Sequence, residues 1–191
     1  TKIFSLLPAN SIIIDAGSRD GDWIHAADVL LYNIFNWDKE THIKSPFIYV
    51  GIDPILCPNI KRYDFFIQGA ISNENKKQVP FFIVENEPGC NSLKSPSNSL
   101  QESIYRGKKS SGIEKIKTLR LDKIISRLIN DTKGTPGYLK LDVQGSELEC
   151  IEGAGDFLQQ FMFIETEIGL DKQKNFYKKG SELEELIQLL I

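Results

Sequence analysis

Five short apolar runs limit most strongly what this chain can fold into. They are rich in Ile, Val, Phe and Tyr and show little polar alternation, which is typical of strands buried on both faces of a parallel sheet. They cover residues 11–16, 47–53, 65–72, 138–143 and 161–168. Helical patterns occur at residues 22–36, 121–130, 146–155 and 181–191. The alternation predicts an α/β fold, a mostly parallel doubly wound sheet with helices on both faces.

Residues 73–118 break this alternation. We interpret them as an insertion on the edge of the sheet, with strands at 79–85 and 113–119 and a mobile Ser-rich segment between them. A chain of 191 residues is long enough to bury a sizeable core, and its composition is ordinary for a globular protein. We therefore expect a single domain over residues 1–191.

The overall composition excludes several classes of protein. A net charge of −3 offers no electrostatic footprint for extended DNA or RNA. No apolar run approaches the roughly 18 residues that a membrane span needs, so no membrane association is expected. Three cysteines without a CxxC pair argue against a disulfide framework and a cysteine zinc site, and they favour a reducing, cytoplasmic location. With only His25 and His42 in addition, no metal site is predicted.

The first apolar run ends in the loop "DAGSRDG" at residues 15–21. In a doubly wound sheet, ligands bind beyond the carboxyl ends of the strands, next to such glycine-containing turns. The loop is not GxGxxG, which disfavours a dinucleotide, and an acid at the strand end suits a cation such as S-adenosylmethionine. The predicted contacts are Asp15, Gly17, Ser18, Arg19 and Gly21. The alternative is an ordinary strand-to-helix turn.

The second and third runs end in further candidate contacts. Asp53 in "VGIDP" can accept hydrogen bonds from both hydroxyls of an adenosine ribose, with Pro54 beside it. Its alternative role is that of a turn former before the proline. Ala70 and Ile71 in "IQGAIS" leave room for a flat adenine ring.

The fourth run begins the string "YLKLDVQGSELECIEGAG" at residues 138–155. It resembles the signature of the FkbM family of S-adenosylmethionine-dependent methyltransferases, whose members read like "KIDVEGAELEVLKGA". Other family-like pieces follow in the expected order, and the resemblance covers roughly residues 11 to 170: "IIIDAGSRDGDW", "VGIDP", "IQGAISN", "CNSL", "KTLRLDKI" and "FIETEIG". Gln144 stands where the family usually has Glu, and Ser146 where it usually has Ala.

The resemblance implies a Rossmann-like class I methyltransferase fold, S-adenosyl-L-methionine as cofactor, and O-methylation of a hydroxyl on a sugar, glycan or secondary metabolite. The class I fold usually adds a terminal β-hairpin. Since residues 181–191 predict a helix and no strand pattern follows, we expect the hairpin to be absent.

Methylation of a hydroxyl requires a group that accepts its proton. Asp142 ends the fourth strand and is the carboxylate we expect to contact cofactor or substrate, while Glu165 and Glu167 end the fifth. Glu165 is the next candidate for the base, and its alternative role is a structural pair with a lysine or a backbone N–H. Glu147 can instead complement the N-terminus of the following helix.

The basic segment "RGKKSSGIEKIK" at residues 106–117 leaves a second function open. Arg106, Lys108 and Lys109 lie either on a solvated face or on a surface for an anionic group such as an RNA backbone. The alternatives are therefore an RNA methyltransferase, or an adenosine-binding domain without turnover. An NAD-dependent oxidoreductase is disfavoured because the chain lacks GxGxxG.

Overall fold

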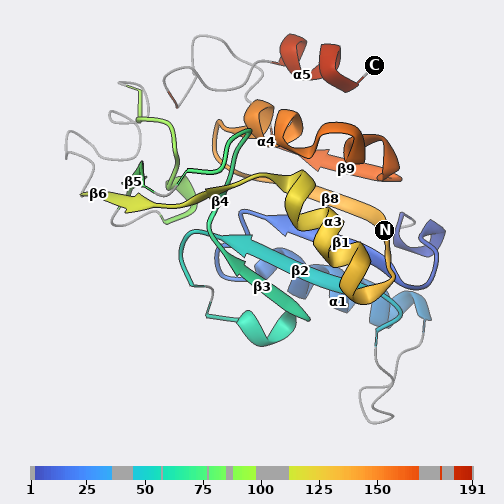
Figure 1. Cartoon of the computed structure of the whole chain (residues 1–191). Helices are drawn as coiled ribbons and strands as arrows, with labels where there is room; N and C mark the ends of the chain where they lie inside the picture. The colour runs from blue at the N-terminus through green and yellow to red at the C-terminus, as the bar shows by residue number, and fades with distance from the viewer. Residues whose placement is uncertain are drawn as a thin grey trace.

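Five parallel strands form the central sheet of the computed structural model, which describes residues 3–35, 45–56, 58–76, 78–84, 88–97, 112–167, 177 and 183–190. The strand order is β3-β2-β1-β8-β9, so the direction of winding reverses between β1 and β8 (Figure 1). The strands are β1 (Ser11–Ala16), β2 (Ile48–Asp53), β3 (Phe65–Gln68), β8 (Thr135–Leu141) and β9 (Phe163–Thr166). The predicted α/β class and parallel sheet are confirmed.

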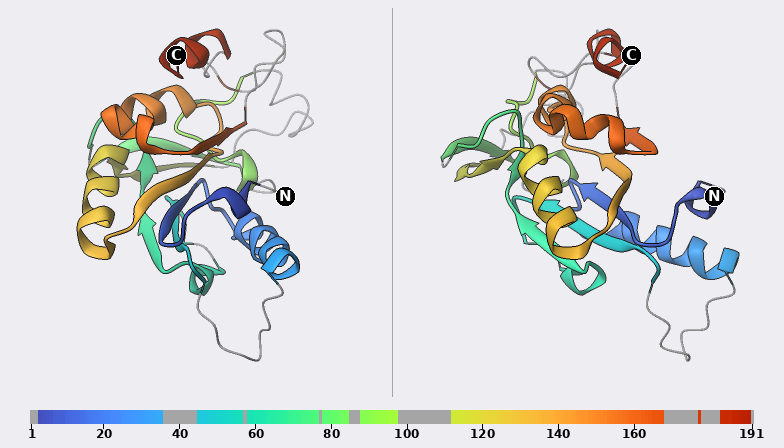
Figure 2. Two further views of the ribbon diagram at one scale, coloured as in Figure 1. Left: turned by 90° about the vertical axis from the view of Figure 1, so that its right-hand side faces the viewer. Right: turned by 45° about the vertical axis from the view of Figure 1, so that its right-hand side comes forward.

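Helices cover both faces of this sheet, as predicted (Figure 2). On one face, α1 (Asp22–Phe35) packs Ile24 and Ala27 against an aromatic cluster that includes Tyr49 and Tyr138. The other face holds the larger core and three helices, namely α3 (Leu121–Thr132), α4 (Glu147–Ala154) and α5 (Leu183–Leu190). All six residues of β1 are buried. Since successive side chains of a strand point to opposite faces, alternate residues of β1 pack into each of the two cores.

Short 3-10 helices complete the described elements. They are η1 (Phe4–Leu6), η3 (Ile60–Arg62), η4 (Pro88–Cys90) and η5 (Gly155–Gln160). Among the residues that the structure describes, no strand joins the central sheet after β9, and no helix is long and apolar enough to cross a membrane.

The single strand predicted over residues 65–72 is wrong, because the structure divides it in two. After β3, the Gly69 N–H donates to the Asp53 carbonyl oxygen (2.9 Å), and the next N–H, of Ala70, donates to Lys117 (3.1 Å). The chain thus ends its pairing with β2 and forms β4 (Ala70–Ile71), which pairs in parallel with β7 (Thr118–Leu119). A Cβ at Gly69 would lie 2.9 Å from the Leu119 side chain, which would have to shift to make room for it.

The single strand predicted over residues 113–119 is also divided, into β6 (Gly112–Ile116) and β7, which pair with different strands. In the insertion, β6 forms an antiparallel pair with β5 (Val79–Ile83), the strand expected at 79–85. The pair lies beyond the arrowheads of β1 and β2 in Figure 1. The insertion therefore stands over the carboxyl ends of the central strands. The Ser-rich segment expected to be mobile lies mostly outside the described residues.

Candidate functional site

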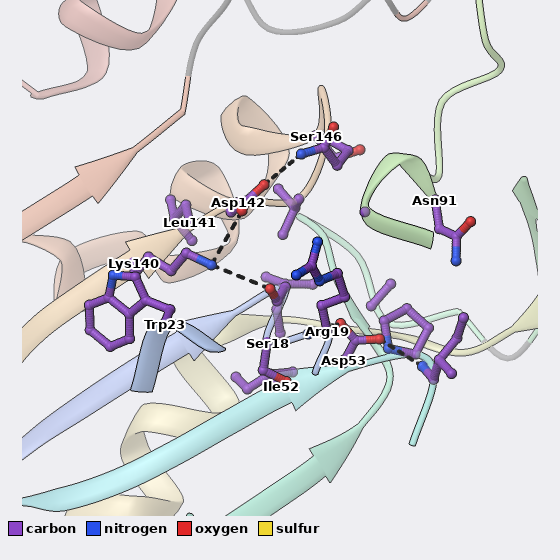
Figure 3. A pocket seen from close by; sticks show the side chains of 18 of the residues that line it. Ser18, Arg19, Trp23, Ile52, Asp53, Asn91, Lys140, Leu141, Asp142 and Ser146 are labelled. Atoms are coloured by element: carbon purple, nitrogen blue, oxygen red, sulfur yellow. Dashed lines mark hydrogen bonds and ion pairs between the residues drawn. The ribbon is translucent and has the colours of Figure 1, made fainter. Parts of the chain in front are cut away.

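A cavity of about 810 Å³ opens at the carboxyl ends of the strands, where the strand order reverses (Figure 3). Its walls come from the loop after β1, the ends of β2, β8 and β9, and the insertion. Most predicted site residues line it, namely Gly17, Ser18, Arg19, Asp53, Pro54, Ala70, Ile71, Asp142 and Glu165. The structure thus brings together residues from five separate stretches of the chain.

Gly17 allows the first loop to cross the exit of β8. Its N–H donates to the Ile52 carbonyl oxygen (2.9 Å), and its φ of 81° lies in the left-handed region that favours glycine. A Cβ here would lie 1.8 Å from the Asp142 carbonyl oxygen. Gly21, with φ 79°, starts α1 by accepting the His25 N–H (3.1 Å). Unlike Gly17, Gly21 is not among the residues that line the cavity.

Asp15 was predicted as a direct ligand contact, and this prediction is not supported. Its side chain is fully buried and does not line the cavity. Its carboxylate accepts the Tyr63 hydroxyl (2.7 Å) and pairs with the Lys140 ammonium (3.1 Å). The Tyr63 ring fits there because Gly51, beside Asp15 in the sheet, has no side chain. Asp15 therefore acts on the site through Lys140.

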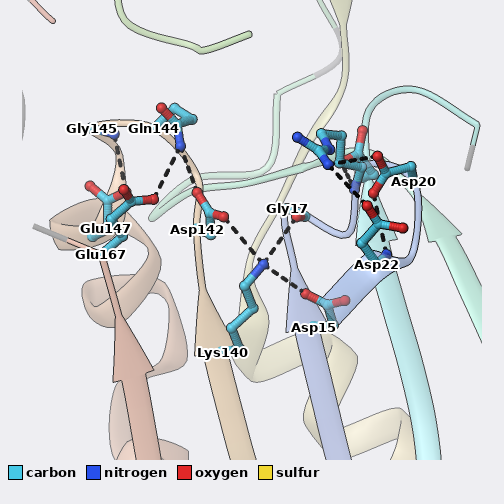
Figure 4. A network of polar contacts seen from close by, with 12 residues as sticks. Asp15, Gly17, Asp20, Asp22, Lys140, Asp142, Gln144, Gly145, Glu147 and Glu167 are labelled. Carbon is cyan, nitrogen blue, oxygen red and sulfur yellow. Dashed lines mark hydrogen bonds and ion pairs between the residues drawn. The ribbon is translucent and has the colours of Figure 1, made fainter. Parts of the chain in front are cut away.

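Lys140 connects this buried carboxylate to the cavity (Figure 4). Its ammonium lies 3.4 Å from the Asp142 carboxylate and donates to the Gly17 carbonyl oxygen (3.4 Å). Burial lowers the pKa of Lys140, but the Asp15 and Asp142 carboxylates outweigh that effect and hold the pKa above its usual value. The sequence analysis did not select Lys140. A lysine inside the apolar run "YLKLDV" was the available signal, because buried lysines are nearly always paired.

Asp53 ends β2 on the opposite side of the cavity from Lys140 (Figure 3). One carboxylate oxygen accepts the Arg19 N–H (2.9 Å) and the other the Ile55 N–H (2.8 Å). Burial raises the pKa of Asp53, and these two backbone donors oppose the rise. The carboxylate is thus held in one orientation while its remaining lone pairs face the cavity that it lines.

Three carboxylates lie where β8 and β9 end. Gln144 donates its side-chain N–H to Asp142 (2.6 Å) and makes a longer contact to Glu167 (3.5 Å). The Glu165 carboxylate accepts the hydroxyl of Tyr138. Asp142, Glu165 and Glu167 all line the cavity.

The charge of the lining is strongly negative. Six carboxylates and two cations contribute to it: Asp20, Asp22, Asp53, Asp142, Glu165, Glu167, Arg19 and Lys140. Both cations are paired, Arg19 with Asp20 (2.6 Å) and Lys140 with Asp15. Such a lining favours a cationic ligand over an anionic one.

The profile of the methyltransferase FkbM domain matches residues 15–190, which is nearly the whole chain. The chain belongs to the FkbM methyltransferase family. The predicted family and fold are therefore confirmed, and the chain is a methyltransferase. No curated protein and no solved structure shows significant similarity to it.

Three buried hydroxyls on residues that line the cavity of this FkbM domain have no hydrogen-bond partner among the described residues. They are Ser18 Oγ, Ser146 Oγ and Thr166 Oγ1. Because a buried hydroxyl without a partner is costly, all three are suited to bind a polar ligand group.

Trp23 and the remaining candidates of the sequence analysis lie as follows. Trp23 lines the cavity and packs against Tyr138, with ring centroids 5.6 Å apart. Glu147 is buried and accepts the Gly145 N–H (3.1 Å) at the start of α4, as the helix-terminus reading expected. His25 is exposed and does not line the cavity. Outside the described residues lie His42, Arg106, Lys108 and Lys109.

Proposed function

We propose that this FkbM methyltransferase uses S-adenosyl-L-methionine to methylate a hydroxyl of a sugar, glycan or secondary metabolite. The observation that carries the proposal is the carboxylate-rich cavity at the point where the strand order reverses, with Asp53 held at its wall. Ligands of doubly wound folds bind at this place. The acceptor class rests on the family resemblance.

The lining suits this methyl donor in charge and in shape. The donor carries a sulfonium and an ammonium, which match a wall where carboxylates outnumber cations. Asp53 is suited to accept the ribose hydroxyls, and Pro54, Ala70 and Ile71 form an apolar slot for the adenine. When bound, the donor supplies an electrophilic methyl group. Gly17 and Ser18 line the cavity where the first loop crosses the exit of β8.

The chain itself contributes orientation and proton acceptance. Holding two reactants in line can supply about 7–11 kcal/mol of the barrier in favourable systems. Asp142, Glu165 and Glu167 are the lining carboxylates at the strand ends that can take the proton of the acceptor hydroxyl. An acceptor that carries phosphate would meet these charges unfavourably, so we expect a neutral or cationic acceptor.

The experiment that tests the proposal is calorimetric titration with S-adenosylhomocysteine and, separately, with NAD. Wild type is compared with Asp53→Asn and with the matched control Asp64→Asn. Asp64 also accepts a backbone N–H, that of Tyr49 (2.9 Å), but it does not line the cavity.

We expect micromolar binding of S-adenosylhomocysteine to wild type and to Asp64→Asn, and binding at least about tenfold weaker in Asp53→Asn, which is about 1.4 kcal/mol. NAD should not bind. Absence of S-adenosylhomocysteine binding to wild type would contradict the proposal. Binding without methyl transfer to any acceptor would favour a domain that holds the ligand without turnover.

A further inference from the structure

The acceptor end of the cavity has three carboxylates that differ in how their oxygens are occupied. This difference allows the proton acceptor to be chosen, on the assumption that the proposed function is correct. The relevant residues come from the exits of β8 and β9 and from the loop before α4 (Figure 4).

The Glu165 carboxylate already accepts a hydrogen bond from a side chain of the neighbouring strand. It is the register partner of Lys140 in the β8–β9 pair, and its Oε2 accepts the hydroxyl of Tyr138. Burial and the Glu165 carboxylate raise the pKa of that tyrosine, so the hydroxyl stays protonated and keeps donating. Glu165 is therefore a structural acceptor more than a base.

Asp142 is held from two sides. The Lys140 ammonium lies 3.4 Å from one of its oxygens, and the Gln144 amide donates to the other (2.6 Å). Both oxygens of Asp142 are therefore occupied by donors of the chain itself. Asp142 is thus suited to a fixed, orienting role.

Glu167 differs from both. Its exposed side chain follows β9 directly, lines the cavity, and receives the Gln144 amide at the longer distance of 3.5 Å. Burial and the neighbouring Asp142 charge raise the pKa of Glu167, while Lys140 and Gln144 oppose the rise. Glu165 lies two residues earlier, on β9, and Glu147, which lies beside Glu167 in Figure 4, accepts the Gly145 N–H. A carboxylate with a raised pKa accepts protons better near neutral pH.

Gln144 contacts the carboxylates of both Asp142 and Glu167. Its backbone adopts φ 57°, and its carbonyl oxygen accepts the Ser92 hydroxyl (2.6 Å). Its side-chain oxygen lies 2.8 Å from the Tyr177 hydroxyl, which leaves the amide nitrogen directed at Asp142 and Glu167. A glutamate at this position would offer no donor and would add a third negative charge.

We propose that Glu167 accepts the proton of the acceptor hydroxyl, and that Gln144 is a positioning residue that holds Glu167 beside Asp142. In this step the hydroxyl proton passes to a Glu167 carboxylate oxygen. The electron pair left on the acceptor oxygen forms the bond to the methyl carbon as the carbon–sulfur bond breaks, and that bonding pair stays on sulfur. No oxidant, reductant or further reactant is needed.

The first test is a carboxyl-carbon NMR titration of the chain saturated with S-adenosylhomocysteine. The Glu167 signal is assigned by its loss in Glu167→Gln. We expect its midpoint to lie above that of the exposed Glu185, and to rise further in Gln144→Glu, where a charge replaces the donor. A Glu167 midpoint equal to that of Glu185 in both proteins would overturn the inference.

The second test measures binding and turnover separately. S-adenosylhomocysteine should bind Glu167→Gln within about twofold of wild type, while methyl transfer to a panel of methyl glycosides should fall about 10²–10⁴-fold. The control Glu185→Gln, on the exposed face of α5, should match wild type in both. Glu167→Gln turning over like wild type overturns this inference alone, whereas failure of wild type to bind contradicts the proposed function. If wild type methylates no glycoside of the panel, the NMR titration of Glu167 tests the inference.

Discussion

At the scale of single residues, the most consequential feature is the row of polar groups that crosses the buried sheet. Asp15 on β1, Lys140 on β8 and Glu165 on β9 are successive register partners. Asp15 and Lys140 are both buried, so each depends on the other for charge compensation. Removing one partner of such a pair costs far more than the pair contributes.

Lys140→Met should therefore destabilise the fold by about 3–5 kcal/mol, because it leaves the Asp15 carboxylate buried without compensation. Adding Asp15→Asn to this variant should recover a large part of the loss. Urea denaturation measures both effects. The control is Arg127→Met, which breaks an exposed pair with Asp131 and should change stability by less than about 1 kcal/mol. If Lys140→Met and Arg127→Met lost the same free energy of unfolding, burial of the pair would not be the cause.

The same variant should become more sensitive to high pH. Without the ammonium, burial raises the pKa of Asp15 further above its unfolded value. A group whose pKa is raised on folding contributes its stability below the unfolded pKa and loses it as the pH rises through the folded value. The stability gap between wild type and Lys140→Met should thus widen from about pH 4 to about pH 7. If the difference in stability between the two proteins narrowed over this pH interval, Asp15 would not be the group responsible.

Gly17→Ala tests the crossing of the first loop over β8. A Cβ would meet the Asp142 carbonyl oxygen at 1.8 Å, on a backbone with φ 81°. We expect a loss of more than about 2 kcal/mol in denaturation experiments, from strain and overpacking together. Gly112→Ala is the matched control, since nothing lies within 4 Å of its Cβ position. A loss of similar size in the control would exclude steric contact as the cause.

At the scale of elements, α4 packs closely against β4, the short strand that follows Gly69. The Cβ position of Gly153 lies 2.4 Å from the Ser72 carbonyl oxygen, just after β4. The same approach brings the Cys150 sulfur within 3.5 Å of the Ile71 carbonyl oxygen. The helix therefore supports the strand whose residues Ala70 and Ile71 line the cavity.

Gly153→Ala should consequently destabilise the protein by about 1–3 kcal/mol, measured by denaturant midpoint. In an open helix the same change stabilises by about 0.5–1 kcal/mol, because alanine loses less backbone entropy than glycine. The sign of the change is thus the test. A stabilised variant would mean that α4 moves away from β4 without cost.

At the scale of the whole molecule, the cavity joins parts of the chain that are far apart in the sequence. The insertion contributes Phe81 and Asn91, and the central strands contribute Asp53 and Asp142. Tyr177 connects the later part of the chain to both, through its hydroxyl contacts to Cys90 and Gln144. A ligand bound among them should stabilise the fold as a unit.

S-adenosylhomocysteine at about 100 times its dissociation constant should therefore raise the unfolding temperature by about 5–10 °C. Differential scanning calorimetry measures the shift. NAD at the same concentration should leave the temperature unchanged, and Asp53→Asn should show a smaller shift than wild type. A shift with NAD alone would indicate a different ligand class.

Much of the architecture could be predicted from local patterns. The apolar runs located the five central strands, because a strand buried on both faces needs an unbroken apolar sequence. The split of residues 65–72 was missed, since Gly69 and the pairing of β4 with β7 depend on contacts with residues 117–119. Gly17, Asp53 and Asp142 were found at the cavity because strand ends can be located from sequence.

The sequence by itself determined which residues form strands and helices, which carboxylates follow the strands, and the family to which the chain belongs. Only the tertiary structure decided that Asp15 is buried against Lys140, and that Gln144 joins Asp142 to Glu167. The physical reason is distance along the chain. Strand ends follow from neighbouring residues, whereas the partner of a buried charge is set by the register between strands, as for Asp15 on β1 and Lys140 on β8.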